Sequence, residues 1–289
     1  MHTCHITTHR AHERRGRSCT LLAAALLAVA APARAQTDFY NTDVGRPLRI
    51  EDANPVERYA LELQAAPLRL ERAAGGEYRW ELEPALSYGI LPRTQLEIGV
   101  PLVAADAGVG SRSAGVAGVD VSVLHALNTE TLSLPALALG ASVLAPVGGL
   151  AADHAYGSLK AIATRTTSLA RFHLNGEYTL GPTLRAEPDG AAPRDIGRWL
   201  AGAAVDRTFP LRSLLVGAEL YARQPLADHE DVEWNAGAGL RYQVGPRWAL
   251  DAGVGRQLNG PERAWHLTFG TAYAFGLQSL IPVGRGGAR

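Results

Sequence analysis

Apolar and polar residues alternate over two long runs between Glu77 and Leu102. In the first run the apolar parity is occupied by Tyr78, Trp80, Leu82, Pro84, Leu86, Tyr88 and Ile90. After Pro92-Arg93 it restarts with Thr94, Leu96, Ile98, Val100 and Leu102. A period of two predicts β-strands, and the Pro92-Arg93 turn signal predicts that they form a hairpin. Runs of about ten residues exceed the ~5–6 usual in soluble sheets and suit the roughly 9–11 that cross a bilayer.

The same alternation recurs and predicts twelve strands. We expect them at 56–70, 77–90, 94–102, 115–127, 131–144, 157–167, 170–180, 196–208, 212–224, 232–243, 247–257 and 264–275. Pro135 falls inside the fifth, where it would mark a β-bulge because proline cannot donate to the ladder. An even number of strands is what single-chain bacterial barrels have.

Short and long connections alternate along the predicted strands. The short ones are 91–93, 128–130, 167–169, 209–212 and 244–246, and the longer ones are 71–76, 103–114, 145–156, 181–195, 225–231 and 258–263. One hairpin alone also fits a half-buried soluble sheet. However, a soluble sandwich has no reason to sort its loops by parity, whereas outer-membrane barrels combine short periplasmic turns with longer extracellular loops. We therefore predict an all-β fold, a closed antiparallel transmembrane β-barrel of twelve strands over residues 56–276.

The first 35 residues are typical of a cleavable secretory signal peptide. Three arginines precede an apolar run from Leu21 to Ala31, and Ala33-Arg34-Ala35 forms the cleavage site. This apolar run is too short for a transmembrane helix. We expect export to the cell outer membrane, an irregular lead segment at 36–55 and a C-terminal tail at 277–289. The lead segment is either a periplasmic tail or a segment folded into the lumen.

Charge and cysteine usage exclude several function classes. The chain has 28 basic and 28 acidic side chains, so no excess of positive charge indicates a nucleic-acid partner. Both cysteines, Cys4 and Cys19, fall within the signal peptide, which leaves the mature chain without a disulfide or a cysteine zinc site. We predict no cofactor and no metal.

Charged residues concentrate on the strand parity that faces the lumen. An arginine on the lipid face would cost roughly 2–4 kcal/mol near the midplane, which forces these residues inward. The lumen-lining candidates are Arg58, Glu62, Arg79, Glu81, Glu83, Glu97, Arg171, Glu177, Arg198, Glu219, Arg223, Glu233 and Arg241. They act either as a selectivity lining for a solute or as salt bridges that fill a narrow barrel. Glu81, Glu83 and Glu97 would form an acidic cluster that favours cations.

Aromatic residues near the strand ends predict girdles at the two membrane interfaces. They are Trp80, Tyr88, Trp199, Trp234, Trp248, Trp265 and Phe275. This face would contact outer-membrane lipids and lipopolysaccharide.

A barrel enzyme would need an activated nucleophile or an acidic rim site. Ser122 and His125 lie three residues apart, hence on opposite faces of a strand. The inward pairs His173 with Asn175 and His266 with Thr268 have no accompanying serine. At the loop tips, Asp153-His154 and Asp228-His229-Glu230-Asp231 suit an omptin-type protease, a divalent cation or plain solvation. We assign no catalytic residue and predict that the chain is not an enzyme.

Three stretches carry a resemblance to a known family. They are YGILPRTQLEIGVPL at 88–102, the lead segment before Glu57-Arg58, and the closing Ala272-Tyr273-Ala274-Phe275-Gly276. They resemble the Gram-negative outer-membrane proteins of the meta-pathway of phenol degradation, which are grouped with FadL-like transporters of hydrophobic compounds. The resemblance implies a role in passage or uptake and supplies no catalytic residues. Barrels commonly end on an aromatic residue recognised by the barrel assembly machinery, whereas here fourteen residues follow Phe275.

The function predicted is an outer-membrane channel or transporter for small solutes, hydrophobic or aromatic ones included. A barrel enzyme of lipase or protease type and a closed structural barrel are the alternatives. Porin-like conductance would support the channel, and normal membrane insertion without conductance would support the structural barrel.

Overall fold

The computed structural model describes residues 46–65, 68–72, 76–106, 112–184, 196–227, 231–260 and 263–276. The predicted signal peptide, residues 36–45 of the lead segment and the C-terminal tail at 277–289 lie outside this part of the chain. No helix in the described part is long and apolar enough to cross a membrane.

The described residues form one antiparallel sheet of sixteen strand segments. They are β1 (Ala60–Gln64), β2 (Leu68–Arg72), β3 (Tyr78–Leu82), β4 (Ala85–Leu91), β5 (Thr94–Gly99), β6 (Leu102–Asp106), β7 (Arg112–Val116), β8 (Val119–Ala126), β9 (Ala136–Ala145), β10 (Tyr156–Thr166), β11 (Arg171–Leu180), β12 (Gly197–Thr208), β13 (Leu214–Pro225), β14 (Glu233–Gly245), β15 (Trp248–Gln257) and β16 (Trp265–Gly276).

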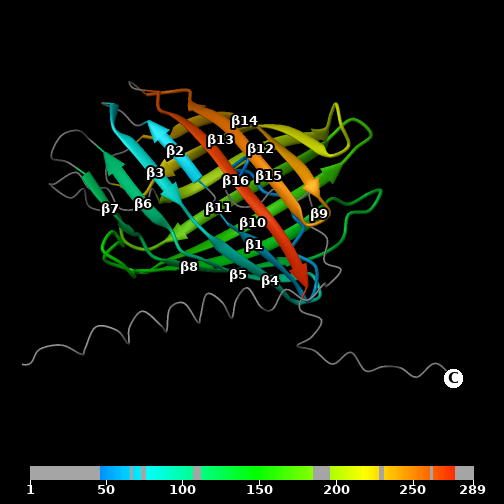
Figure 1. The fold of residues 1–289 in the computed structure, drawn as a ribbon, viewed down its shortest axis with the longest axis horizontal. Coiled ribbons are helices and arrows are strands. Elements are labelled where there is room, and N and C mark those ends of the chain that lie inside the picture. Colours follow the sequence, from blue (N-terminus) through cyan, green and yellow to red (C-terminus); the bar gives the residue numbers. More distant parts are fainter. Residues whose placement is uncertain are drawn as a thin grey trace, which may run out of the picture.

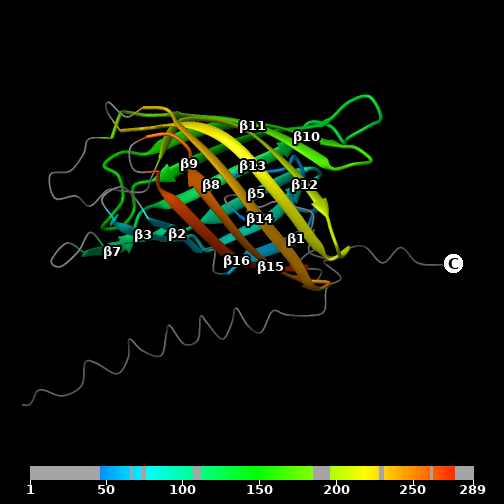
Figure 2. The same ribbon diagram turned by 90° about the horizontal axis from the view of Figure 1, so that it is seen from above.

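The sixteen segments make a closed barrel of twelve strands, because the first eight are halves of four broken strands (Figures 1 and 2). β1 with β2, β3 with β4, β5 with β6, and β7 with β8 each form one crossing. β16 closes the barrel by pairing with β15 along one edge and with both β1 and β2 along the other. The predicted strand number and antiparallel closure are confirmed.

The breaks in the first four strands lie side by side and form a crease across the wall. Pro84 separates β3 from β4, Pro101 separates β5 from β6, and Gly118, with a φ of 142°, precedes β8. Val100 donates its N–H to the Pro84 carbonyl, and Ala117 donates to that of Pro101. Proline fixes φ and has no N–H, so a regular ladder cannot pass through these positions. The alternation predicted the first two of these strands as continuous, and it placed most of β6 and β7 in the connection at 103–114.

The ladder is also incomplete at one place near the long-loop rim. β7 pairs with β6, whereas β9, which pairs with β8, ends at Ala145. The connection after β9 covers the other edge of β7, where Leu150 donates its N–H to the Val116 carbonyl. A chain segment without strand geometry therefore completes the wall beside β7.

The two faces of the wall differ as the alternation predicts. On β11, Phe172, Leu174 and Tyr178 are exposed toward the lipid side, whereas His173 and Asn175 are buried toward the lumen. Trp80, Trp234 and Trp248 of the predicted aromatic girdles are likewise exposed. An all-round apolar exterior suits lipid, because the polar backbone is satisfied within the closed sheet.

The predicted boundary of the fifth strand is wrong. β9 begins at Ala136, directly after Pro135, so the proline ends the turn and no bulge forms inside the strand. Since Pro135 has no N–H, it fits before the first ladder position.

Candidate functional site

Residues 46–55, the described part of the lead segment, lie inside the barrel as a plug (Figure 1). The Leu48 and Ile50 side chains are 2% and 0% exposed, and both pack with Ala204 and Tyr221 on the inner wall. At its other end the plug places Ala53 against the alanines at the β8–β9 turn. It therefore occupies the lumen near the rim of short turns, which outer-membrane barrels place in the periplasm.

Main-chain groups of the plug are bound by polar side chains of the wall. Glu219 accepts the N–H groups of Arg49 and Ile50 at 2.6 and 2.9 Å. Asn175 accepts the Glu51 N–H and donates to the Glu51 carbonyl. These contacts satisfy an irregular backbone that is buried away from water.

Ion pairs hold the plug to the same wall. Arg46 lies 3.0 Å from Asp251, with both side chains buried, and also donates to Gln64. Lys160 contacts Glu51 at 2.5 Å. Breaking a buried pair by removing one partner leaves an uncompensated charge, which makes these contacts costly to lose.

A third network joins the plug end to β10, β11 and β12. Arg171 lies 3.5 Å from Asp52 and donates two hydrogen bonds to Asp206. His173 links Asp206 to Thr164, whose hydroxyl accepts the Ala53 N–H.

Glycines on the inner wall leave room for the plug. An added Cβ at each would come within 3 Å of a plug atom: Gly202 with Ile50, Gly217 with Leu48, Gly239 and Gly253 with Pro47, and Gly270 with Arg46. Gly217, Gly239 and Gly253 are direct neighbours across β13, β14 and β15. Such a row of inward glycines is the sequence signal that could have located the plug.

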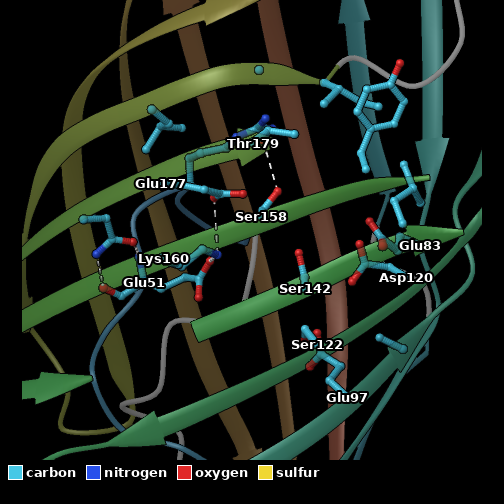
Figure 3. A pocket seen from close by; sticks show the side chains of 18 of the residues that line it. Glu51, Glu83, Glu97, Asp120, Ser122, Ser142, Ser158, Lys160, Glu177 and Thr179 are labelled. Atoms are coloured by element: carbon cyan, nitrogen blue, oxygen red, sulfur yellow. Dashed lines mark hydrogen bonds and ion pairs between the residues drawn. The ribbon is translucent and has the colours of Figure 1, made fainter. Parts of the chain in front are cut away.

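A cavity of about 230 Å³ lies beside the plug within the barrel. A row of hydroxyls crosses its wall over β8–β11, because Ser122, Ser142, Ser158 and Thr179 are successive cross-strand neighbours. Figure 3 shows this row with Glu83 and Asp120 on one side and Lys160 on the other. Ser87 donates to Glu97 at the end of the row.

Cationic residues line another part of the cavity. Arg49 of the plug, Arg69 of β2 and Arg223 of β13 all line it. Arg223 is 2.6 Å from Glu233. Lys160 also lines the cavity, paired with Glu51 and Glu177, so charges of both signs line the wall.

The end of the cavity near the long loops is apolar. Leu144 and Tyr156 line it and pack with Leu226, and Ile196 packs against this cluster. Trp199 also lines the cavity, although the alternation predicted it as a girdle residue. A register shift between Gly197 and Trp199 interrupts the period of two there, which explains the difference.

The structure places the thirteen predicted lumen residues in several settings. The cavity is lined by Glu81, Glu83, Glu97, Glu177 and Arg223. Arg171 and Glu219 hold the plug, as described above. Glu62 and Arg241 are buried in the wall, and Glu233 is the partner of Arg223.

The other three predicted lumen residues are not among those that line the cavity. Arg198 donates to the Thr179 and Gly181 carbonyls. Arg79 is the cross-strand neighbour of Glu71 on β2. Arg58 is exposed, with its guanidinium 4.4 Å from the Tyr59 ring, because the regular strand begins only at Ala60.

The predicted set omits residues that the site uses. Lys160, Asp206 and Asp251 share the inward parity and could have been included from alternation alone. Their plug partners could not have been identified in this way, since period-two patterning assigns a face and not a contact.

The enzyme candidates are dispersed. His125 is exposed and bonded to Thr94, whereas Ser122 lines the cavity. His173 does have a hydroxyl neighbour, Thr164, which the search for serine missed. That hydroxyl is buried and already accepts an N–H from Ala53, so no substrate carbonyl reaches it. Asp153 and His154 are exposed, and Asp228–Glu230 fall outside the described residues. No group of three or more metal-ligating side chains is found in the described part.

Solved structures similar to this fold are outer-membrane barrels. The KdgM porin in complex with disordered oligogalacturonate superimposes with a TM-score of 0.51 at 13% identity, covering 75% of this chain and 99% of the porin. An outer-membrane channel from Pseudomonas putida F1 gives 0.50 at 17% identity, covering 78% and 98%. Identities this low show a shared fold only.

Comparisons at the level of sequence place the chain in a family. No curated protein matches it. A family model, described as the MetA-pathway of phenol degradation, matches residues 80–275, more than half of the 289-residue chain. The match covers β4 to β15 entirely and most of β3 and β16. The chain therefore belongs to the family of the MetA-pathway of phenol degradation.

Proposed function

We propose that the barrel is an outer-membrane channel or transporter for small solutes that carry an apolar or aromatic part. The observation that carries the proposal is the cavity inside the closed barrel, with an apolar end at Leu144 and Tyr156 and charged walls beside the plug. Binding sites of this kind combine an apolar lining with a few polar groups that orient the ligand. The exposed apolar exterior supports placement in the outer membrane.

The cavity size suits one aromatic ring. A cavity of about 150 Å³ accommodates benzene, so about 230 Å³ holds a single ring with a short substituent. Larger solutes would require the lining to rearrange.

Passage requires the plug to move, since it fills the lumen between the cavity and the short-turn rim. The wall holds it through hydrogen bonds, ion pairs and apolar contacts, without a covalent link among the described residues. Such contacts can be exchanged for others, which suits a gate.

Planar-bilayer conductance of the purified mature chain tests the proposal. Replacing Leu48 and Ile50 together by serine removes the apolar seat of the plug, and we expect the open conductance to rise at least about tenfold, since burying each side chain contributes roughly 1.5–3 kcal/mol. Leu132→Ser, at a 99% exposed turn residue, is the matched control and should leave conductance unchanged. Absence of conductance in wild type and in the double variant, with both correctly inserted, would favour the closed structural barrel.

Proteoliposome uptake tests the solute class. Benzoate should enter faster than gluconate, which has the same charge and no ring. Equal rates would contradict the preference for an aromatic part while leaving the channel itself in place.

A further inference from the structure

Charges of both signs line the cavity wall. Glu81, Glu83 and Asp120 come from the β3, β4 and β8 region, whereas Arg49, Arg69 and Arg223 come from the plug, β2 and β13. Lys160 of β10 also lines the cavity, paired with Glu51 and Glu177. Acidic and basic side chains meet between two adjacent strands, where Arg69 of β2 is the direct cross-strand neighbour of Glu81 of β3. A solute at this place therefore meets both signs of charge.

On the acidic side two carboxylates converge. The Glu83 carboxylate lies over Gly99, where an added Cβ would be 3.0 Å from Oε1. The cross-strand neighbour of Gly99 is Asp120, which lies beside Glu83 in Figure 3. Neighbouring carboxylates raise the local negative potential, and an ammonium group of a ligand would relieve it.

On the basic side three arginines, Arg49, Arg69 and Arg223, line the cavity. Arg223 is paired with Glu233, and Arg69 lies 3.8 Å from Glu71. Within the described ranges no ion pair of the Arg49 guanidinium is found, and the Glu219 carboxylate binds the Arg49 main-chain N–H. Arginine suits carboxylate ligands because its planar fork of donors matches both oxygens.

We propose that the cavity selects zwitterionic aromatic solutes, with the carboxylate at Arg49 and Arg69 and the ammonium at Glu83 and Asp120. The ring then lies toward the apolar end formed by Leu144 and Tyr156. The hydroxyl row over β8–β11 also lines the cavity and supplies neutral hydrogen-bonding partners. This assignment names the solute class of the proposed channel and rests on that proposal.

Four probes with the same phenol ring separate the charges: tyrosine, tyramine, 3-(4-hydroxyphenyl)propionate and p-cresol. Binding to the purified mature chain in detergent is measured by titration calorimetry at pH 7. We expect tyrosine to bind at least about tenfold more tightly than each singly charged probe, and p-cresol most weakly, since a hydrogen bond to a charged group contributes roughly 1.5–3 kcal/mol. Equal affinities, or no binding of any probe, would overturn the assignment.

Two variants test the two ends separately. Arg49→Gln should weaken the binding of tyrosine and of the propionate about tenfold and leave the affinity for tyramine unchanged. Glu83→Gln should weaken the binding of tyrosine and tyramine and leave the affinity for the propionate unchanged. Arg112→Gln, in an exposed pair with Asp106, is the control. Loss of all binding in either variant, with the barrel folded by circular dichroism, would contradict separate ends. Conductance is measured independently, so a channel without charge selection and a binding protein without conductance give different results.

Discussion

The two halves of the barrel wall are built differently. In β1–β8 every strand is broken at the crease, whereas β9–β16 run 10–13 residues without a break. The unbroken half provides most of the contacts to the plug, through Glu219, Asp251 and the row of glycines, and Gln64 of β1 adds one from the creased half. The creased half contributes the acidic side of the cavity. A regular ladder fixes inward side chains at constant spacing, which suits a surface that must fit an irregular segment.

The largest difference between the halves is expected in their ion pairs. Asp251→Ala in the unbroken half leaves Arg46 buried without its partner and should lower the free energy of unfolding by about 3–5 kcal/mol. Asp106→Ala in the creased half breaks an exposed pair with Arg112 and should cost no more than about 1 kcal/mol. Urea unfolding in detergent, followed by tryptophan fluorescence, measures both, and equal losses would contradict the comparison.

A smaller effect is expected from filling the space that the inward glycines leave for the plug. The Cβ of Gly239→Leu would meet Pro47 at 2.6 Å, which should disfavour the seated plug by about 1–3 kcal/mol. Limited proteolysis of residues 46–55 should then become faster. Gly176→Leu, where an added Cβ has open space, is the control and should leave the cleavage rate unchanged.

The smallest effect is expected at the crease. Pro101→Ala restores one N–H, but Pro84 and Gly118 still interrupt the neighbouring strands. The free energy of unfolding should change by less than about 1 kcal/mol. A change above 2 kcal/mol would show that one proline alone sets the crease.

Most of the barrel could be predicted from the sequence because lipid imposes a strict period of two. The bounds expected for the strands from Tyr156 onward lie within two residues of those of β10–β16. The crease could not be predicted from parity, since Pro84 keeps the apolar alternation while removing an N–H. Trp199 was assigned to the lipid face because a register shift leaves no trace in the pattern.

The candidate site was less accessible to prediction. Inward charges were identified by parity, but which of them hold the plug and which line the cavity depends on contacts between residues far apart in sequence. Arg46 and Asp251 are 205 positions apart, for example. The sequence contains both the inward glycines and the charged lead segment, but only the structure shows that they are in contact.

The position of the plug before β1 has a consequence for the order of assembly. Most of its polar partners lie on β10–β16, so the plug cannot be fully anchored until the last third of the chain has formed its hairpins. β1 directly follows the plug in sequence, and its pairing with β16 closes the barrel. Contacts over such separations carry a large loop-closure entropy and form slowly. We therefore expect the plug to be enclosed when the β1–β16 pairing forms. The first residues of the barrel domain would then be among the last to reach their native positions.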